Sequence, residues 1–581
     1  MRVLGLLLLA MLLSCTTESK DELPAFTTQF EISKGRETAT YGQVLDFYIQ
    51  LAKKFPEINM QTIGETDSGY PLHIVTYNPE GSFNFQKIRE NNSVILINNG
   101  IHPGESDGID ATMMLYRDLA MGKQDPPKNT VLATIPVYNV GGALNRNKDT
   151  RANQNGPKSY GFRGNALNYD LNRDFIKMDS KNARTFTEIF HLVKPDVFID
   201  THVSNGADYQ YTLTHLFTQH NKMGGELGSY IRERLTPILA DTLKTKNWEI
   251  TPYVNVYDRA PEGGFDQFMD YPRYSTGYAA LWNTLGLMVE THMLKPYKQR
   301  VWGTYDLLLG MLRIVDSESG TIARLRQKAK SRHRGWTHYP ISWQVDTTRT
   351  TYITFKGYAV DTLYSEVTGF TRLKYDRSRP FTKKIPYADH YKPLDSVKIP
   401  TAYILKKPWN SVTGLLDLNK ITYTPLQKDT VIEVESYRIK DFETRNSPYE
   451  GHYLHFNTTV IKDTVRMAFK EGDLLIPVDQ PGARYLLETL EPQAVDSFFN
   501  WNFFDSILQR KEGFSPYVFE EVAAKMLKKD RKLLEAFTAK KRTDTLFGQN
   551  GYAQLDWLYE RSPHYETAHR QYPVYRIMDA K

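Results

Sequence analysis

The chain has 581 residues, a formal net charge of +6 and 24% charged residues. This length allows about three to four domains with a sizeable core. The charge is small for the size and the basic residues form no long runs, which argues against a nucleic-acid surface; the densest patch, at 528–532, is interpreted as a solvated helix face. Cys15 is the only cysteine, which excludes intramolecular disulfides.

The N-terminus predicts a targeting segment. Met1 and Arg2 are followed by an apolar run at 3–13 and then by Ser14 and Cys15. The run is too short to span a bilayer, and with Cys15 it resembles a bacterial lipoprotein signal. We therefore expect a signal peptide at 1–14, a lipidated Cys15 and a polar tether at 15–35. Lipidation would anchor the protein in the bacterial cell envelope, at the outer membrane, either in the periplasm or exposed at the surface. An ordinary cleaved secretory signal with an incidental cysteine is the alternative.

Residues 36–330 alternate strand-like and helix-like segments. Apolar runs at 93–97 and 130–140 predict buried strands, and the apolar spacing at 107–120 and 182–192 predicts helices. Alternation of this kind indicates an α/β domain with a mostly parallel or mixed sheet flanked by helices. Residues 320–338 are interpreted as a helix end and linker.

The first strand leads into a pair of metal-ligand side chains. Residues 93–97 end in Asn98-Asn99-Gly100, and His102 and Glu105 follow, separated by a Pro-Gly turn. An imidazole nitrogen and a carboxylate oxygen from such a turn can reach one zinc ion at about 2.0–2.2 Å. By itself this spacing is a weak signal, so the interpretation depends on segments further along the chain.

Three later segments add groups of the same chemical kind. Residues 163–174 bring together Arg163, Asn172 and Arg173, and guanidinium groups bind carboxylates with two parallel hydrogen bonds. The apolar strands at 195–202 and 285–290 end in His202 and Glu290. In open α/β sheets, ligands bind at the carboxyl edge of the strands, where these side chains are expected to meet.

The four segments, in this order, resemble the zinc carboxypeptidases of the carboxypeptidase A type, over roughly residues 40–320. Arg163 stands nine residues before Asn172, as in many members of that family. The resemblance implies a carboxypeptidase-like fold and one zinc ion. It also implies the following roles: metal ligands His102, Glu105 and His202; general base Glu290; oxyanion donor Arg163; substrate carboxylate binding by Asn172 and Arg173.

Some positions depart from the family pattern. The family usually has a gating tyrosine upstream of the catalytic glutamate. In this chain Phe268 stands near that position, so the tyrosine has no clear counterpart. Tyr274 is our candidate for substrate binding, with a packing role as the alternative. Arg273 could read an acidic side chain of the substrate, but we prefer to interpret it as a structural ion-pair partner. Arg146 and Arg151 compete with Arg163 for the oxyanion role. His292, on the same strand face as Glu290, is expected to be a buried structural histidine.

The C-terminal half shows a different pattern. Alternating segments at 352–355, 431–435 and 452–456 predict a β-rich, sandwich-like domain at 340–482, and apolar spacing predicts a helical region at 483–581. His452 and His455 face opposite sides of a strand, which argues against a metal pair. The aromatic residues around Trp501 are expected to dock on the catalytic domain.

We expect a membrane-anchored zinc carboxypeptidase that cuts amide bonds next to a free carboxylate in peptides or peptidoglycan stem peptides. Two alternatives remain open. One is a zinc amidase or deacylase acting on small acyl-amino acids. The other is a surface lipoprotein that binds peptides or glycans without turnover. The sequence gives no indication of an oligomeric state.

Overall fold

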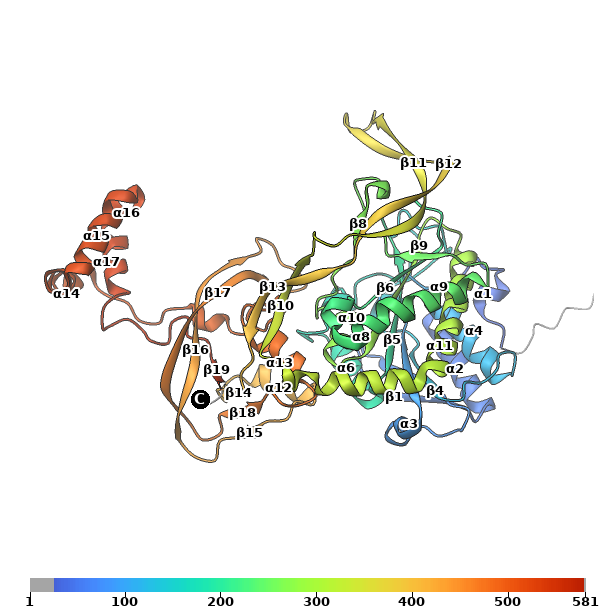
Figure 1. Ribbon diagram of the computed structural model, residues 1–581, viewed down its shortest axis with the longest axis horizontal. Helices are drawn as coiled ribbons and strands as arrows, with labels where there is room; N and C mark the ends of the chain where they lie inside the picture. Colours follow the sequence, from blue (N-terminus) through green and yellow to red (C-terminus); the bar gives the residue numbers. More distant parts are fainter. Residues whose placement is uncertain (1–25, 579–581) are drawn as a thin grey trace, which may run out of the picture.

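The computed structural model describes residues 26–578 (Figure 1). The predicted signal peptide, Cys15 and the tether up to residue 25 lie outside the described residues. Among the residues that are described, no helix has both the length and the apolar character needed to cross a bilayer. The α/β part lies at one end of an elongated molecule, a sheet-rich part follows, and a helical group projects at the far end (Figure 1).

Within the described residues, an eight-stranded mixed sheet forms the centre of the α/β part, in the order β1-β2-β4-β3-β5-β9-β6-β7. The strands are β1 (Ile58–Glu65), β2 (Pro71–Tyr77), β3 (Ser93–Asn98), β4 (Thr130–Ile135), β5 (Val197–Ser204), β6 (Leu213–Phe217), β7 (Ile250–Pro252) and β9 (Leu285–His292). The central strands β4, β3, β5 and β9 run parallel, so β3, β5 and β9 end at one edge as predicted. The strand predicted at 130–140 ends earlier, because Asn139 caps a short helix, α5 (Val140–Leu144).

Helices cover both faces of this sheet (Figure 1). The helices on one face are α2 (Tyr41–Lys54), α4 (Asp107–Ala120) and α11 (Tyr297–Ser331), and those on the other are α6 (Lys181–Val193) and α10 (Ser275–Leu281). Side chains alternate along β5, so Thr201 faces α4 while Phe198, Asp200 and His202 face α10. The close approach of α4 requires Gly108, since a Cβ there would lie 2.0 Å from Oγ1 of Thr201.

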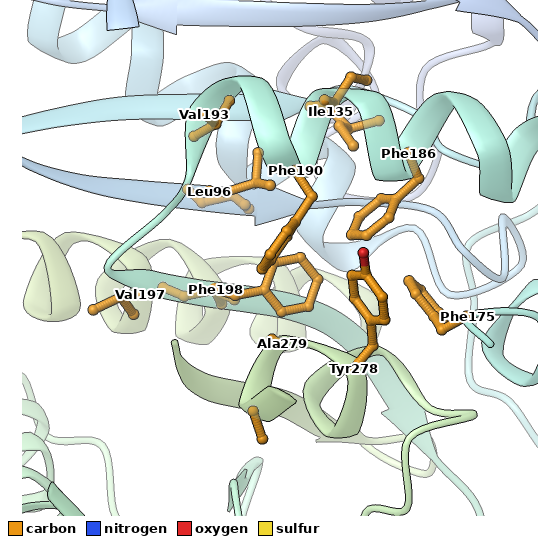
Figure 2. Close-up of a cluster of buried hydrophobic side chains, with 14 of the residues drawn as sticks. Leu96, Ile135, Phe175, Phe186, Phe190, Val193, Val197, Phe198, Tyr278 and Ala279 are labelled. Atoms are coloured by element: carbon orange, nitrogen blue, oxygen red, sulfur yellow. The ribbon is translucent and has the colours of Figure 1, made fainter. Parts of the chain in front are cut away.

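An aromatic core fixes α6 and α10 against the sheet. Figure 2 shows Phe186 and Phe190 of α6 meeting Phe198 of β5 and Tyr278 of α10. The ring centroids of Phe186 and Phe198 lie 5.8 Å apart, and those of Phe190 and Tyr278 lie 5.3 Å apart. Burying one such side chain stabilises the fold by about 1.5–3 kcal/mol. The core therefore holds the start of α10 close to the carboxyl edge of β5 and β9.

The predicted β-rich region is present. Its strands are β10 (His338–Val345), β11 (Thr351–Tyr364), β12 (Thr371–Ala388), β13 (Tyr391–Lys398), β14 (Ala402–Leu405), β15 (Thr424–Pro425), β16 (Thr430–Thr444), β17 (His455–Phe469) and β18 (Leu474–Pro477). β11 and β12 form a long hairpin that projects from the molecule (Figure 1). At the base of the hairpin, the C-terminal end of β12 pairs with β8 (Phe265–Asp266) of the α/β part. A short helix, α12 (Asn410–Leu418), follows β14.

The C-terminal region contains the predicted helices and also one strand of the preceding β-rich part. It begins with α13 (Ala483–Leu490), and a helical group with its own small core follows: α14 (Pro516–Lys529), α15 (Arg531–Thr543), α16 (Thr545–Gly548) and α17 (Gly551–Tyr559). The chain then returns as β19 (Val574–Ile577), which lies between β14 and β16 in a sheet ordered β15-β18-β14-β19-β16-β17. The four residues of β19 show too little alternation for this strand to be predicted from the sequence.

The α/β part and the β-rich part share one continuous hydrophobic core. Trp282 stacks on Tyr485 with ring centroids 5.8 Å apart, and Nε of Arg273 lies 2.7 Å from Oδ1 of Asp496. Arg273 is therefore an ion-pair partner, as the preferred interpretation stated. Trp501 is also buried in this core, in agreement with the predicted docking of its segment.

Candidate metal centre

Two histidines and a glutamate converge at the carboxyl edge of the sheet. Nδ1 of His102 lies 3.3 Å from Oε2 of Glu105, and Nδ1 of His202 lies 3.1 Å from the same oxygen. One ligand atom from each residue lies within 4.8 Å of those of the other two, and all three side chains are buried. Among residues 26–578, this is the one group of three or more histidine, cysteine and acidic residues with such geometry.

Two aspartates orient the imidazoles. Nε2 of His102 lies 2.9 Å from Oδ1 of Asp170, and Nε2 of His202 lies 2.9 Å from Oδ2 of Asp200. Since an ionised carboxylate only accepts, each Nε2 carries a proton and donates, and each Nδ1 faces Glu105, where its lone pair can bind a metal ion once no proton is held there. Nδ1 of His102 is buried without a hydrogen-bond partner.

Backbone and charge position the glutamate. Oε2 of Glu105 accepts a hydrogen bond from the Val203 amide at 2.9 Å, and Oε1 lies 2.8 Å from Nη1 of Arg151. Burial raises the pKa of Glu105, but Arg151 and His102 lower it by more, so the carboxyl group has a pKa well below its usual range. An ionised carboxylate and two imidazole Nδ1 atoms form the donor set of a catalytic zinc site with an open position. The residues therefore fit the metal.

Glu290 lies at the end of β9, beside β5, where it pairs with His202 in the sheet register. Burial raises the pKa of Glu290 to about 8; His202 opposes this shift and Glu105 adds to it. The group can thus hold a proton near neutral pH, as an acid–base catalyst requires. A cation in the site would lower this pKa.

The predicted arginines differ in where they lie. Nη1 of Arg163 lies 3.4 Å from Oε1 of Glu105, and its Nε donates to Asp170 at 3.0 Å. Arg151 also lines the cavity, whereas Arg146 donates to the carbonyls of Ala39 and Ser159. Arg146 is thus tied to backbone outside the site, while Arg151 remains beside Arg163.

The residues expected to bind a carboxylate line the same cavity, which has a volume of about 450 Å³. Oδ1 of Asn172 accepts a hydrogen bond from the Ser275 amide at 3.1 Å, which leaves Nδ2 as its donor end. The guanidinium carbon of Arg173 lies 4.6 Å from the ring centroid of Tyr274, whose ring meets Phe268 edge-on at 5.0 Å. Tyr274 thus supports Arg173 from the side and borders the cavity.

Three further histidines each have an aspartate partner of their own. His292 is buried, lies 3.1 Å from Asp208 and stacks on Tyr209 at 4.1 Å, which fits a structural role. His452 and His455 contact different aspartates, Asp179 at 2.8 Å and Asp505 at 3.1 Å, so they form no metal pair.

The roles of Asp170 and Asp200 were not predicted from the sequence. Asp200 stands two residues before His202 on a strand, so both side chains share a face, and that spacing was a usable signal. Asp170 lies 68 residues from His102 along the chain, and no local pattern connects them.

Comparisons with known proteins agree with this geometry. Residues 44–196 match the model of the zinc carboxypeptidase family. That segment contains His102, Glu105, Arg163, Asn172 and Arg173, while the structure adds His202 and Glu290. Together with the geometry of His102, Glu105 and His202, this match supports a zinc metallopeptidase. A search among curated proteins gives no match.

Solved structures with a similar course of the chain include the following carboxypeptidases. One from Burkholderia cenocepacia has 14% identity and a TM-score of 0.35, with 48% of this chain and 70% of that chain covered. A putative carboxypeptidase A from Shewanella denitrificans has 15% identity and a TM-score of 0.36, with 48% and 69% covered. Carboxypeptidase A from Helicoverpa armigera has 14% identity and a TM-score of 0.37, with 48% and 74% covered.

Proposed function

We propose that the protein is a zinc-dependent carboxypeptidase that hydrolyses the amide bond next to a free carboxylate in peptides, including peptidoglycan stem peptides. One observation carries the proposal: the three metal-binding side chains, Glu290 and the pair Asn172–Arg173 line a single cavity. A catalytic carboxylate and a carboxylate-binding pair on the same cavity are what the reaction requires.

His102, Glu105 and His202 would hold one zinc ion. When bound, zinc lowers the pKa of water to near 7 and polarises a carbonyl group. The aspartates on Nε2 hold a proton there and turn Nδ1 of both imidazoles toward the metal position, so neither ring has to turn before the metal can bind.

Glu290 would act as the acid–base group. Its carboxylate takes a proton from the attacking water and delivers it to the nitrogen of the leaving amine. Arg163 would donate to the carbonyl oxygen as negative charge develops there. Arg151 lies close enough to share this role, but its shorter contact with Glu105, 2.8 Å against 3.4 Å, ties it more firmly to the metal ligand.

The substrate's terminal carboxylate would bind between Asn172 and Arg173, because a guanidinium fork matches the two carboxylate oxygens. Leu216 and Met288, opposite each other on β6 and β9, add apolar surface to the cavity beside Glu290. We therefore propose that apolar C-terminal side chains are preferred. Tyr274, stacked on Arg173, borders the same subsite.

We also propose that the protein is lipid-anchored in the bacterial cell envelope through Cys15. The support is the apolar run followed by a lone cysteine and a polar tether. An envelope location would bring the enzyme into contact with peptides and with peptidoglycan fragments.

The test is a set of peptides and muropeptides incubated with purified full-length protein and analysed by mass spectrometry. Release of single C-terminal residues, sensitivity to a chelator and no cleavage of matched C-terminal amides would support a carboxypeptidase. Cleavage of acyl-amino acids alone would favour a deacylase. Binding without turnover would favour the non-catalytic alternative, although a binder has no use for the buried Glu290.

A further inference from the structure

A tight turn from the β-rich part reaches the active site. The loop between β16 and β17 contains a turn closed by two backbone hydrogen bonds, from Tyr449 N to His452 O at 2.7 Å and from His452 N to Tyr449 O at 3.1 Å. Its two central residues, Glu450 and Gly451, have φ angles of +50° and +84°. Positive φ at both central positions is the pattern of a type I′ turn, which favours Asn, Asp and Gly.

Glu450 is therefore an unexpected residue at its position. Glutamate gains nothing from a positive φ, since its Cβ crowds the backbone there, whereas glycine adopts this conformation freely. Residues held in such conformations concentrate at functional sites, where the side chain has a task that outweighs the backbone cost.

The contact that Glu450 makes identifies this task. Its Oε2 accepts a hydrogen bond from the backbone amide of Asp170 at 2.7 Å. The side chain of Asp170 in turn holds three groups of the site: Oδ1 contacts Nε2 of His102 and the Asn172 amide, each at 2.9 Å, and Oδ2 accepts from Nε of Arg163 at 3.0 Å. Glu450 thus fixes the backbone from which a metal ligand and the oxyanion donor are oriented.

Neighbouring contacts keep the turn in register with the α/β part. Nε2 of His452 lies 2.8 Å from Oδ2 of Asp179, and a Cβ on Gly451 would lie 2.9 Å from Cε1 of Tyr169. The turn therefore packs directly on the segment that carries Asp170.

We propose that Glu450 is a positioning residue of the active site, supplied by the β-rich domain, which orients Asp170 and through it His102 and Arg163. The catalytic part would then depend on the β-rich domain for a fully aligned metal site. The effect on turnover rests on the proposed function, whereas the effect on zinc affinity does not.

A purely structural role for Glu450 would be to hold the two parts together. The shared core and the Arg273–Asp496 ion pair at 2.7 Å already do this. Loss of one hydrogen bond at the turn should leave the parts joined, so the two roles can be separated by experiment.

Glu450→Gly in the full-length protein is the decisive variant, because glycine relieves the positive φ while removing the acceptor. We expect an unchanged or higher Tm, a zinc Kd about 3–10-fold higher in chelator competition, and a similar fall in kcat/KM. A direct hydrogen-bond partner of a metal ligand typically changes metal affinity by about 10–100-fold. We expect a smaller change because Glu450 acts on His102 only through Asp170. Glu450→Gln keeps an acceptor oxygen and should stay close to wild type.

Asn457→Gly is the matched control, since Asn457 is exposed on β17 at φ +53° and contacts Glu443. It should alter neither zinc affinity nor turnover. Wild-type zinc affinity in Glu450→Gly would overturn the proposal, and so would a loss of zinc affinity that is matched by a lower Tm or that appears equally in Asn457→Gly. If the wild-type protein cleaves no peptide, the proposed function fails, and the zinc measurement alone decides the role of Glu450.

Discussion

Nε2 of His202 donates to Oδ2 of Asp200 at 2.9 Å, and this contact turns the other nitrogen, Nδ1, toward Glu105 and the metal position. Burial lowers the pKa of His202, but Asp200 and Glu105 raise it by more. A metal ion must therefore displace a proton from Nδ1, not from Nε2, and Asp200 keeps the ring turned for that exchange.

Asp200→Asn should weaken zinc binding. An amide retains the shape but loses the negative charge that fixes the imidazole tautomer, and loss of such a partner typically costs about 10–100-fold in metal affinity. Chelator competition measures this change. Asp208→Asn removes the same charge from His292 outside the site and should leave zinc affinity unaltered. Equal affinities in all three proteins would contradict the assigned role of Asp200.

Glu290→Gln should separate metal binding from turnover. The amide cannot accept the proton of the attacking water, so kcat should fall by about 10²–10⁴-fold. Zinc content, measured by elemental analysis, should stay near one ion per chain because Glu290 is not a ligand. A variant that turns over at the wild-type rate would remove Glu290 as the general base.

Arg173→Met should raise KM for peptides with a free C-terminal carboxylate. A hydrogen bond to a charged group is worth about 1.5–3 kcal/mol, which corresponds to about 10–100-fold in binding. Steady-state kinetics give the split between KM and kcat, and kcat should change less. Arg379→Met, on the exposed hairpin, is the control and should match wild type. An unchanged KM in Arg173→Met would place the carboxylate subsite elsewhere.

The local parts of the site were predictable from sequence. The strands before His102, His202 and Glu290 are apolar runs, and parallel strands that end at one edge bring such side chains together. The contacts that orient these groups were not predictable. Glu450 lies 280 residues from Asp170, and the turn that joins them depends on how the β-rich domain docks. Periodicity reports local conformation and burial, so it says nothing about such long-range pairings.

Cys15→Ala should release the protein from the membrane. The substitution removes the thiol that would carry the lipid, and an unlipidated chain keeps only the short apolar run. Fractionation of cells followed by immunoblotting measures the shift to the soluble fraction. Ser14→Ala is a neighbouring control that leaves the cysteine in place. Membrane association that persists in Cys15→Ala would refute the anchor.

Glu488 should make stability depend on pH. Burial raises the pKa of this carboxyl group to about 7, while the hydrogen bond from Tyr339 at 2.9 Å and the cations Lys222 and Arg484 oppose the shift. From about pH 4.5 to 7 the unfolded chain loses its proton and the folded protein keeps it. The contribution of Glu488 is therefore fully present at low pH and is lost as pH rises through this window, by about 3 kcal/mol in total.

Glu488→Gln mimics the protonated side chain, because its amide oxygen can still accept from Tyr339. Urea unfolding followed by fluorescence should show wild type losing stability relative to this variant as pH rises from 4.5 to 7, with a constant difference above that range. Glu433→Gln, on the exposed side of β16, should keep the wild-type profile. Parallel curves for wild type and Glu488→Gln would mean that Glu488 is already ionised in the folded protein, with Lys222 and Arg484 as sufficient partners.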